Sequence, residues 1–587
     1  MKQTFLLVAL CLSGALCSAQ TPYPLNEYNE LTDLRPPVDE GLWSKVPTIP
    51  PLRWGSTDIR YTKHDVPAIP HLPIWKATAW KGERVNAQAV LWTRNFHKDV
   101  RLGVSELRNG SSIIPTEAIQ PAFVRYVMTD ELNKDGKSGC SQRPDKAEWD
   151  SSLVADVLDP AAHLCIDACT TQPIWLTISI PSDARPGVYK GTLTVSTDDM
   201  TAQQLPFEIN VIDRRLPAAK DWAFHLDLWQ NPYSVARYYQ VPLWSQAHFD
   251  AMRPVMKLLA DAGQKVITAS IMHKPWNGQT EDAFDSMIAK IKKIDGTWSY
   301  DYTVFDKWVE FMMNEIGIDH QINCYTMIPW ALRFDYFDQA TGRILFIEAQ
   351  PGEPAYNEYW GAFLQDFATH LRTKRWFEKT TIAMDERGLD AMQEAIKVIR
   401  KADPDYKISL AGNYHSEIEH ELHDLCLAYT HPFPAEVKTA RQKAGKVSTV
   451  YTCCAEARPN TFTFSPPYEA TWIGWHVMAG NYDGYLRWAY NSWTADPLRD
   501  SRFRSWAAGD CYLIYPGARS SIRMERLIEG IQDAEKIRLL REEFTRKKAS
   551  GKLQKLNRIV SELSTEGMLR PDPAARLKNA REALNRF

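Results

Sequence analysis

The chain has 587 residues, of which 44% are hydrophobic and 24% are charged, as in an ordinary globular protein of about three or four domains. Its net charge of -3 at pH 7 does not favour nucleic acid or an anionic membrane as a partner. After the N-terminal segment, no run is apolar for long enough to span a bilayer, so we expect no stable membrane insertion.

Residues 1–19 have the pattern of a secretory signal peptide. Lys2 supplies the positive charge, residues 5–16 supply an apolar core, and residues 17–19 form a small-residue cleavage site. A lipoprotein cleavage site needs a small residue directly before the cysteine, but here Leu16 precedes Cys17. We therefore expect a secreted or periplasmic protein rather than a lipoprotein.

Export would permit disulfide bonds among the eight cysteines that follow the predicted cleavage site. Cys140, Cys165 and Cys169 lie close together in a polar region, and one bridge among them is consistent with this spacing, although the sequence does not determine the pairing. Buried thiols are expected in the apolar runs that contain Cys324, Cys426, Cys453 and Cys511.

Residues 20–216 have a β pattern with many prolines. Strands are indicated at residues 86–94 and 100–107, and most clearly in residues 173–212. There, turn residues separate the alternating runs PIWLTISIP, YKGTLTVS and PFEINVI. This pattern is typical of a β-sandwich. Such a domain could bind sugar or brace its neighbour, and we favour bracing because a fold does not by itself indicate a function.

Residues 217–522 alternate between strands and helices, which predicts a (β/α)8 TIM-like barrel rather than an open sheet. Amphipathic helices fit the gaps between strands, for example at residues 249–262, 304–316 and 359–373. The eight strand candidates are residues 223–228, 265–271, 321–327, 380–384, 407–411, 425–429, 448–452 and 484–490.

The last segment, residues 523–587, is charged and helical, and we expect it to pack on the barrel through one apolar stripe. The stripe consists of Leu527, Ile531, Ala534, Ile537 and Leu540. The predicted protein is therefore multidomain, with an N-terminal β-sandwich, a central barrel and a C-terminal helical segment.

Two adjacent acids, Asp385 and Glu386, follow the fourth predicted barrel strand and precede a helix predicted at residues 389–402. A barrel presents its catalytic groups where strands end, so this pair is the candidate catalytic site. Neighbouring strand residues point to opposite faces, so both acids can reach one cavity only if the backbone turns there. The alternative is a solvated pair that caps the following helix, because acids favour a helix N-terminus.

Aromatic, amide and basic side chains follow other predicted strands and are candidates for sugar binding. Aromatic faces can stack on sugar rings, and amide or guanidinium groups can bind hydroxyls. These assignments depend on the strand register, because a shift of one residue would exchange Arg487 for Trp488 at the cavity. The candidates are Trp330, Asn413, Tyr429, Arg487, Trp488 and Asn491.

Other chemistries lack their motifs. The sequence contains no HExxH zinc helix, P-loop or GxSxG elbow. His415, His420 and His423 fit a solvated charged face, and the Cys453-Cys454 pair has no second pair nearby. We therefore predict neither a metal nor a cofactor.

Four segments together resemble glycoside hydrolase family 123 and its relatives, the β-N-acetylgalactosaminidases. Their sequences are IWLTISIPSDARPGVYKGTLTV, FHLDLWQNP, the MDE strand end, and GDCYLIYPG followed by SSIRMERLIEGIQDAE. The resemblance covers most of the chain after the signal segment. The Asp-Glu pair at the end of the fourth strand is its most specific part.

The resemblance implies a retaining hydrolase in which the 2-acetamido group of the substrate is the nucleophile, an exception to the usual scheme with two carboxylates. Asp385 would orient the acetamido N–H and stabilise the oxazolinium intermediate. Glu386 would protonate the departing oxygen and later activate water. Tyr429 would bind the acetamido carbonyl, Trp330 or Trp488 would wall the sugar ring, and Arg487 and Asn491 would hold hydroxyls.

The implied substrate is a glycan or glycolipid that carries β-linked N-acetylgalactosamine. A hydrolase for β-linked N-acetylglucosamine, or for another 2-acetamido sugar, remains an alternative, because N-acetylgalactosamine and N-acetylglucosamine differ only in the orientation of the C4 hydroxyl. A non-catalytic glycan-binding protein is a second alternative. The sequence determines neither exo or endo action nor the oligomeric state.

Overall fold

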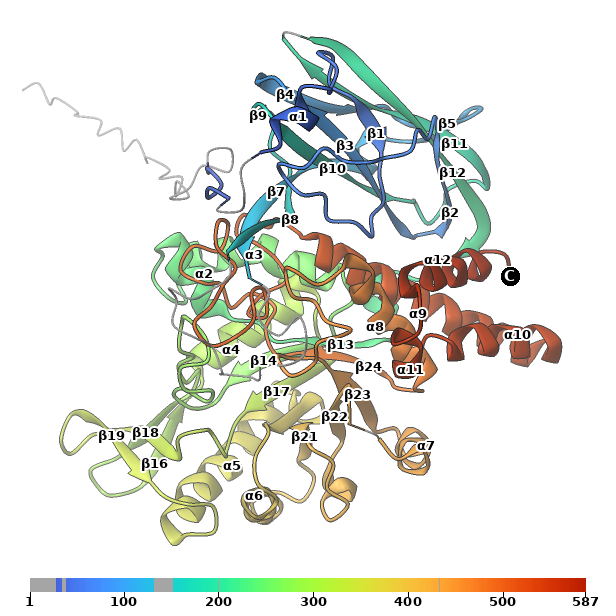
Figure 1. Cartoon of the computed structure of the whole chain (residues 1–587). Helices are drawn as coiled ribbons and strands as arrows, with labels where there is room; N and C mark the ends of the chain where they lie inside the picture. The colour runs from blue at the N-terminus through green and yellow to red at the C-terminus, as the bar shows by residue number, and fades with distance from the viewer. Residues whose placement is uncertain (1–27, 34–37, 131–150, 199, 432) are drawn as a thin grey trace, which may run out of the picture.

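The structure is a computed structural model that describes residues 28–33, 38–130, 151–198, 200–431 and 433–587. The predicted signal peptide and Cys140 lie outside these ranges. Figure 1 shows an N-terminal β-rich domain, a central barrel and a set of C-terminal helices. The predicted architecture of β-sandwich, (β/α)8 barrel and helical segment is confirmed.

Two sheets, preceded by the short helix α1 (Glu40–Trp43), form the N-terminal sandwich. The first sheet contains, in order, Leu52–Trp54 (β1), Arg84–Thr93 (β3), Thr170–Ser179 (β10), Ile119–Thr129 (β7) and Ser152–Asp159 (β8). The second contains Trp75–Lys81 (β2), Met200–Arg215 (β12), Gly187–Thr197 (β11), His97–Val104 (β4) and Leu164–Ile166 (β9). Leu107–Asn109 (β5) pairs with β11, and Ser112–Ile114 (β6) pairs with β5.

Period-two alternation explains how the sandwich packs. Along β10, Ile174 and Leu176 join the core between the two sheets, which also contains Leu193 and Phe207 from the second sheet. Trp175 points the other way and packs beside Ile522 of the C-terminal segment. The first sheet is therefore buried on both faces, which ties the sandwich to the rest of the molecule.

Eight parallel strands form the barrel, and neighbours in sequence are neighbours in space. They are His225–Leu228 (β13), Val266–Ser270 (β14), Gln321–Tyr325 (β17), Thr380–Met384 (β20), Lys407–Gly412 (β21), Asp424–Ala428 (β22), Val447–Tyr451 (β23) and Gly484–Arg487 (β24). Each overlaps one of the predicted strands, and β20 coincides with its prediction.

The barrel is nearly closed between its first and second strands. The backbone N–H of Lys265 donates to the carbonyl of Leu226 at 2.9 Å. The side-chain carbonyl of Gln264 accepts from the N–H of Leu228 at 3.0 Å and substitutes for a ladder hydrogen bond. Gln264 thus satisfies backbone groups at the seam that would otherwise be buried without a partner.

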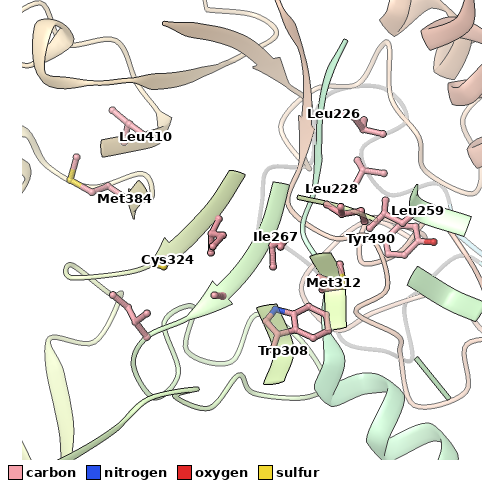
Figure 2. Close-up of a cluster of buried hydrophobic side chains, with 14 of the residues drawn as sticks. Leu226, Leu228, Leu259, Ile267, Trp308, Met312, Cys324, Met384, Leu410 and Tyr490 are labelled. Carbon is pink, nitrogen blue, oxygen red and sulfur yellow. The ribbon is translucent and has the colours of Figure 1, made fainter. Parts of the chain in front are cut away.

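Helices surround the barrel and pack on the outward-facing side chains of its strands. Figure 2 shows part of this layer, in which Ile267 of β14 lies beside Trp308 and Met312 from the helical side. The helices are Pro232–Tyr239 (α2), Gln246–Ala260 (α3), Thr303–Glu310 (α4, continued by a π-helical turn at Phe311–Ile316), Pro354–Lys374 (α5), Leu389–Ala402 (α6), Ala435–Lys443 (α7) and Pro467–Ala479 (α8).

A small four-stranded sheet, which the sequence did not predict, is inserted after β14 and β17. It consists of Trp298–Asp301 (β16), Ala289–Lys292 (β15), Arg333–Asp338 (β18) and Arg343–Glu348 (β19), in that order. Trp298 and Phe334 pack against Tyr359 of α5, with ring centroids 5.6 and 5.5 Å away. In Figure 1 this sheet stands out from the barrel.

The C-terminal segment forms Ile522–Arg546 (α9), Ser550–Ser561 (α10), Thr565–Met568 (α11) and Pro573–Leu584 (α12). The predicted apolar stripe of α9 is buried, and α9 packs along α8 of the barrel domain. Its polar face is also buried, because Glu525 and Glu529 meet Arg84 and Asn86 of the sandwich at 3.2 and 2.8 Å. Helix α9 therefore lies between the barrel and the sandwich.

The cysteines differ in part from expectation. Cys165 and Cys169 are free thiols, so the bridge expected among Cys140, Cys165 and Cys169 is not formed, because any such bridge would use one of these two. Cys324, Cys426 and Cys511 are buried as predicted, whereas Cys453 is only half-buried. Cys454 is disulfide-bonded, which the sequence did not predict. Among the helices of the described residues, none is both long enough and apolar enough to cross a membrane.

Candidate active site

A cavity of about 500 Å³ opens at the carboxyl ends of the barrel strands, where the fold places catalytic groups. Its walls come from five of the eight strand ends and from three loops that follow β14, β17 and β24. The lining residues are Trp229, Trp276, Asn277, Gly278, Gln279, Trp330, Asp385, Glu386, Ala411, Tyr451, Cys453, Cys454, Leu486, Trp488, Ser505 and Trp506.

Asp385 and Glu386 both line this cavity. Along β20, Met384 packs in the outer core and Ala383 faces the interior, so Asp385 continues the inward phase. Strict alternation would turn Glu386 outward, but the strand ends at Met384 and the backbone bends. The N–H of Glu386 donates to Oδ1 of Asp385 at 2.8 Å, which stabilises the bend.

The two acids occupy different surroundings. Asp385 is half-buried, whereas Glu386 is exposed to the cavity mouth. Burial raises the pKa of Asp385 to about 6, and the charge of Glu386 adds to this rise. The N–H of Glu386 and the indole of Trp330 oppose it by stabilising the carboxylate. Asp385 is therefore ionised at neutral pH and is readily protonated in mild acid.

Tyr451 holds the second acid. Its hydroxyl, at the end of β23, donates a hydrogen bond to Oε1 of Glu386. Burial and the charge of Glu386 raise the pKa of Tyr451 far above its usual range, so the phenol keeps its proton and remains a donor. Sequence reasoning missed Tyr451, although Thr449, Tyr451 and Cys453 occupy the inward positions of that strand by alternation.

Aromatic rings form the floor of the cavity. Trp229 lies 5.0 Å from Trp276 and 4.5 Å from Tyr325, measured between ring centroids. These rings belong to an apolar layer that closes the barrel interior beneath the acids and that also contains Ala383 and Leu486. A sugar in the cavity would therefore meet carboxylates beside it and flat apolar faces around it.

Two further tryptophans line the upper walls. Trp330 is 43% exposed, and the guanidinium of Arg387 lies 4.9 Å from its ring centroid. Trp488 meets Trp506 edge-on, with centroids 5.8 Å apart at an interplanar angle of 71°. Trp506 is in turn fixed by its indole N–H, which donates to the carbonyl of Gln279 at 2.8 Å.

The structure brings four of the eight predicted site residues to the cavity: Asp385, Glu386, Trp330 and Trp488. Asn413 is exposed beyond the end of β21 and is not among the lining residues.

Three residues lie elsewhere, contrary to expectation, because of register and strand length. Tyr429 packs 4.1 Å from His476 of α8, outside the barrel wall. Arg487 takes the outward phase of β24 and pairs with Asp510 at 2.6 Å. Asn491 lies beyond the end of the strand, where its side-chain amide donates to the carbonyl of Asn231 at 2.9 Å.

Within the described part of the chain, no group of three or more His, Cys, Asp or Glu residues has the arrangement to hold a metal ion. The acids that line the cavity among those residues are Asp385 and Glu386. The chemistry that the site can perform with its own side chains is therefore proton transfer and electrostatic stabilisation by two neighbouring carboxyl groups.

Two family models match the chain. The model of the glycoside hydrolase 123 catalytic domain matches residues 229–540, and that of the glycoside hydrolase 123 N-terminal domain matches residues 54–197. The first match alone spans more than half of the sequence. The chain belongs to glycoside hydrolase family 123. The resemblance seen in the sequence is confirmed, and the chain is a glycosidase by family.

One solved structure agrees with this family. The chain is similar to a family 123 glycoside hydrolase from Clostridium perfringens whose structure was described for glycolipid glycan hydrolysis, with 27% identity, a TM-score of 0.82, and coverage of 92% of this chain and 97% of that chain.

The chain also resembles a family 39 glycoside hydrolase from Bacteroides cellulosilyticus, with 10% identity, a TM-score of 0.33, and coverage of 78% of this chain and 82% of that chain. For a GH5 xyloglucanase from Bacteroides ovatus, the identity is 9%, the TM-score is 0.28, and the coverage is 82% of this chain and 100% of that chain. Neither bears on function. A comparison with curated proteins found no match.

Proposed function

We propose that this family 123 enzyme is a retaining β-N-acetylgalactosaminidase that acts on glycans or glycolipids by substrate-assisted catalysis. The observation that carries the proposal is the pair of adjacent acids, Asp385 and Glu386, in one cavity with aromatic walls. The similar enzyme from Clostridium perfringens, described for glycolipid glycan hydrolysis, supports the substrate class. The signal-like segment at residues 1–19 supports export to the periplasm or the medium.

The placement of the two acids favours a nucleophile that comes from the substrate. Ordinary glycosidases use two carboxyl groups that flank the scissile bond, about 5 Å apart when retaining and about 6.5–9.5 Å apart when inverting. Here both acids project from a single bend, and the N–H of one is bonded to the carboxylate of the other. Among the described lining residues, no other carboxylate lies across the cavity.

In the proposed first step, the acetamido oxygen attacks the anomeric carbon while the glycosidic C–O bond breaks. Glu386, held by Tyr451, gives its proton to the departing oxygen. The product is an oxazolinium ion whose positive charge is stabilised by the Asp385 carboxylate next to it. Asp385 also accepts a hydrogen bond from the acetamido N–H and so orients the attacking oxygen.

In the second step, water attacks the anomeric carbon and the oxazolinium ring opens. Glu386 is now a carboxylate and takes a proton from that water, which restores the starting protonation state. Two inversions at the anomeric carbon give net retention. The aromatic floor excludes bulk water from beneath the ring, which strengthens the interaction of Asp385 with the intermediate.

A series of nitrophenyl glycosides whose N-acyl group carries zero to three fluorine atoms tests the mechanism. Fluorine weakens the acyl oxygen as a nucleophile, so kcat/KM should fall steeply along the series, by about tenfold or more per step if attack limits the rate. Rates that do not depend on fluorination would contradict substrate assistance. Running nitrophenyl β-GalNAc and β-GlcNAc side by side decides between the two sugars.

Two variants separate the roles of the acids. Glu386→Gln should lose most activity on glycosides with poor leaving groups and keep more on activated aryl glycosides, because only the former need protonation. Asp385→Asn should impair both, because formation of the oxazolinium ion fails. Release of sugar from a natural glycan is measured by mass spectrometry. If both variants released sugar as fast as the wild type, these roles would be excluded. Glycan binding without any release of sugar would instead indicate a non-catalytic binding protein.

A further inference from the structure

Asp510 lies directly behind the cavity wall and has no exposed surface. It belongs to the segment between β24 and α9 that also carries Trp506. One carboxylate oxygen, Oδ1, accepts a hydrogen bond from Nη2 of Arg487 at 2.6 Å. The other, Oδ2, accepts from the indole Nε1 of Trp488 at 3.3 Å. A single carboxylate thus joins a buried cation to a ring that lines the cavity.

Arg487 is a fixed anchor for this carboxylate. It is completely buried, and its Nη1 donates to Oδ1 of Asn460 at 2.9 Å and to the hydroxyl of Thr452 at 3.3 Å. Because the guanidinium is planar and held on both sides, Asp510 cannot shift without breaking a buried ion pair. The other partner of Asp510, Trp488, is only half-buried.

We infer that Asp510 is a positioning residue that fixes the indole of Trp488, and thereby sets the shape of the wall against which the amino sugar binds. The inference rests on the proposed function for its sugar. The chemistry requires a carboxylate, because both neighbours of Asp510 are donors and each needs an acceptor. An asparagine would place its NH2 group against one of these two donors, so that donor would lose its acceptor.

A double-mutant cycle with Trp488→Phe tests this link. Phenylalanine keeps an aromatic wall but removes the N–H that Asp510 accepts. Asp510→Asn alone should raise KM by about tenfold and change kcat by less than about threefold, because the wall acts on substrate and transition state alike. In the Trp488→Phe background, the same substitution should change KM by less than about twofold. The inference would be overturned if Asp510→Asn changed KM by the same factor in both backgrounds, or if it left KM unchanged in the single variant.

Asp159 provides a matched control. Its carboxylate is also buried, and it lies between two arginines, Arg125 at 3.2 Å and Arg519 at 2.9 Å, away from the cavity. Asp159→Asn should lower the melting temperature, as any break in a buried ion pair does, but leave KM unchanged. If Asp159→Asn raised KM as much as Asp510→Asn, the effect would be one of general stability and the positioning role would be excluded.

A measurement that needs no activity separates this inference from the proposed function. The substitution Trp488→Phe removes the indole N–H resonance of Trp488 from the NMR spectrum and so identifies it. Asp510→Asn should shift this resonance and speed the exchange of the N–H with solvent. The indole of Trp175, which donates to Asn86 at 3.1 Å in the sandwich, is the internal reference.

If Asp510→Asn fails to fold, the wild-type protein still decides the question once Trp488→Phe has identified the resonance. A Trp488 N–H bonded to a buried carboxylate should exchange slowly, and rapid exchange would overturn the inference. If no 2-acetamido sugar is cleaved, the proposed function fails, and these resonances still report whether Asp510 holds Trp488.

Discussion

Two neighbouring carboxyl groups can perform different tasks only if their surroundings differ. Asp385 is half-buried beside Trp330, whereas Glu386 is exposed and bonded to Tyr451. Burial raises the pKa of Asp385 to about 6, so ionised Asp385 is costly in the empty site and would become favourable next to the oxazolinium intermediate of the proposed mechanism. In the proposed mechanism, the Asp385 carboxylate would therefore interact more favourably with the transition state, in which positive charge develops, than with the ground state.

The first prediction follows from this pKa. If Asp385 must be ionised to orient the acetamido group, kcat/KM should fall tenfold per pH unit below a pH of about 6, with one proton responsible. The kcat/KM profile of the wild-type enzyme on nitrophenyl β-GalNAc measures this. A profile that stays flat down to pH 4 would show that the ionised form is not required.

The same pKa predicts the effect of pH on stability. A folded pKa above the unfolded value means that the folded state binds the proton more tightly, so stability is lost as pH rises from about 4 through about 6. Asp385→Asn should therefore be more stable than wild type at pH 7.5, by on the order of 1–3 kcal/mol. At pH 4 the two should match. Thermal unfolding at both pH values checks this, and an equal difference at both would contradict it.

The second prediction concerns Tyr451. Tyr451→Phe removes the donor that holds the Glu386 carboxyl group while keeping the ring that packs in the barrel interior. We expect kcat to fall by roughly 10–100-fold, because Glu386, the proposed general acid, would be misplaced and would lose most of its advantage. The loss should be largest on substrates with poor leaving groups. Equal losses on activated and natural glycosides would indicate that Tyr451 acts on the sugar instead of Glu386.

At the scale of elements, strand phase decides which side chains reach the cavity. At the end of β24, Leu486 and the following Trp488 line it, whereas Arg487 between them turns outward to Asp510. At the end of β22, Ala428 faces the interior, and Tyr429, the next residue, turns toward α8. Alternation was visible in the sequence, but its phase relative to the barrel interior was not, and one residue of phase reverses every assignment.

The third prediction concerns the packing of α8 on α9, which depends on two glycines. A Cβ at Gly474 would lie 2.1 Å from the carbonyl oxygen of Gly530, a contact that cannot form without moving a helix. Gly474→Ala should therefore destabilise the protein by about 1–3 kcal/mol or more. Gly361 in α5 has open space around its Cβ position and is the control. Gly361→Ala should gain about 0.5–1 kcal/mol. Equal melting temperatures of the two variants would contradict this account.

On the scale of the whole molecule, one buried acid joins the sandwich to the C-terminal segment. Asp156 of β8 has no exposed surface and accepts hydrogen bonds from Arg60 at 2.9 Å, Arg523 at 2.8 Å and Tyr515 at 2.6 Å. Burial alone would raise the pKa of Asp156, but the two arginines hold it below its usual range. The same segment that carries Arg523 continues from the cavity wall, so the sandwich braces the catalytic barrel.

The fourth prediction tests this bracing. Asp156→Ala leaves two buried arginines without their shared partner and should cost about 3–5 kcal/mol. We expect a single calorimetric transition at a lower temperature, because sandwich and barrel share the interface. Asp198 forms an exposed pair with Arg101, and Asp198→Ala should cost less than about 1 kcal/mol. Two separate transitions in the Asp156 variant, with the barrel unaffected, would show that the domains are stable independently.

Local signals in the sequence determined the elements. Apolar runs of strand length located all eight barrel strands, since burial on both faces of a parallel strand demands such runs. The Asp385-Glu386 pair was found because acids directly after a buried strand lie at the catalytic end of a barrel. These features depend on residues near each other in the chain.

Tertiary structure decided what distant residues do together. Tyr451 meets Glu386 from another strand, Trp506 reaches the cavity from a loop after β24, and Asp510 connects Arg487 to Trp488. The small sheet after β14 and the burial of charged residues on α9 also have no local signal. The physical reason is that register, loop course and ion pairing are set by contacts across the fold, whereas periodicity reports only whether a segment has a buried face.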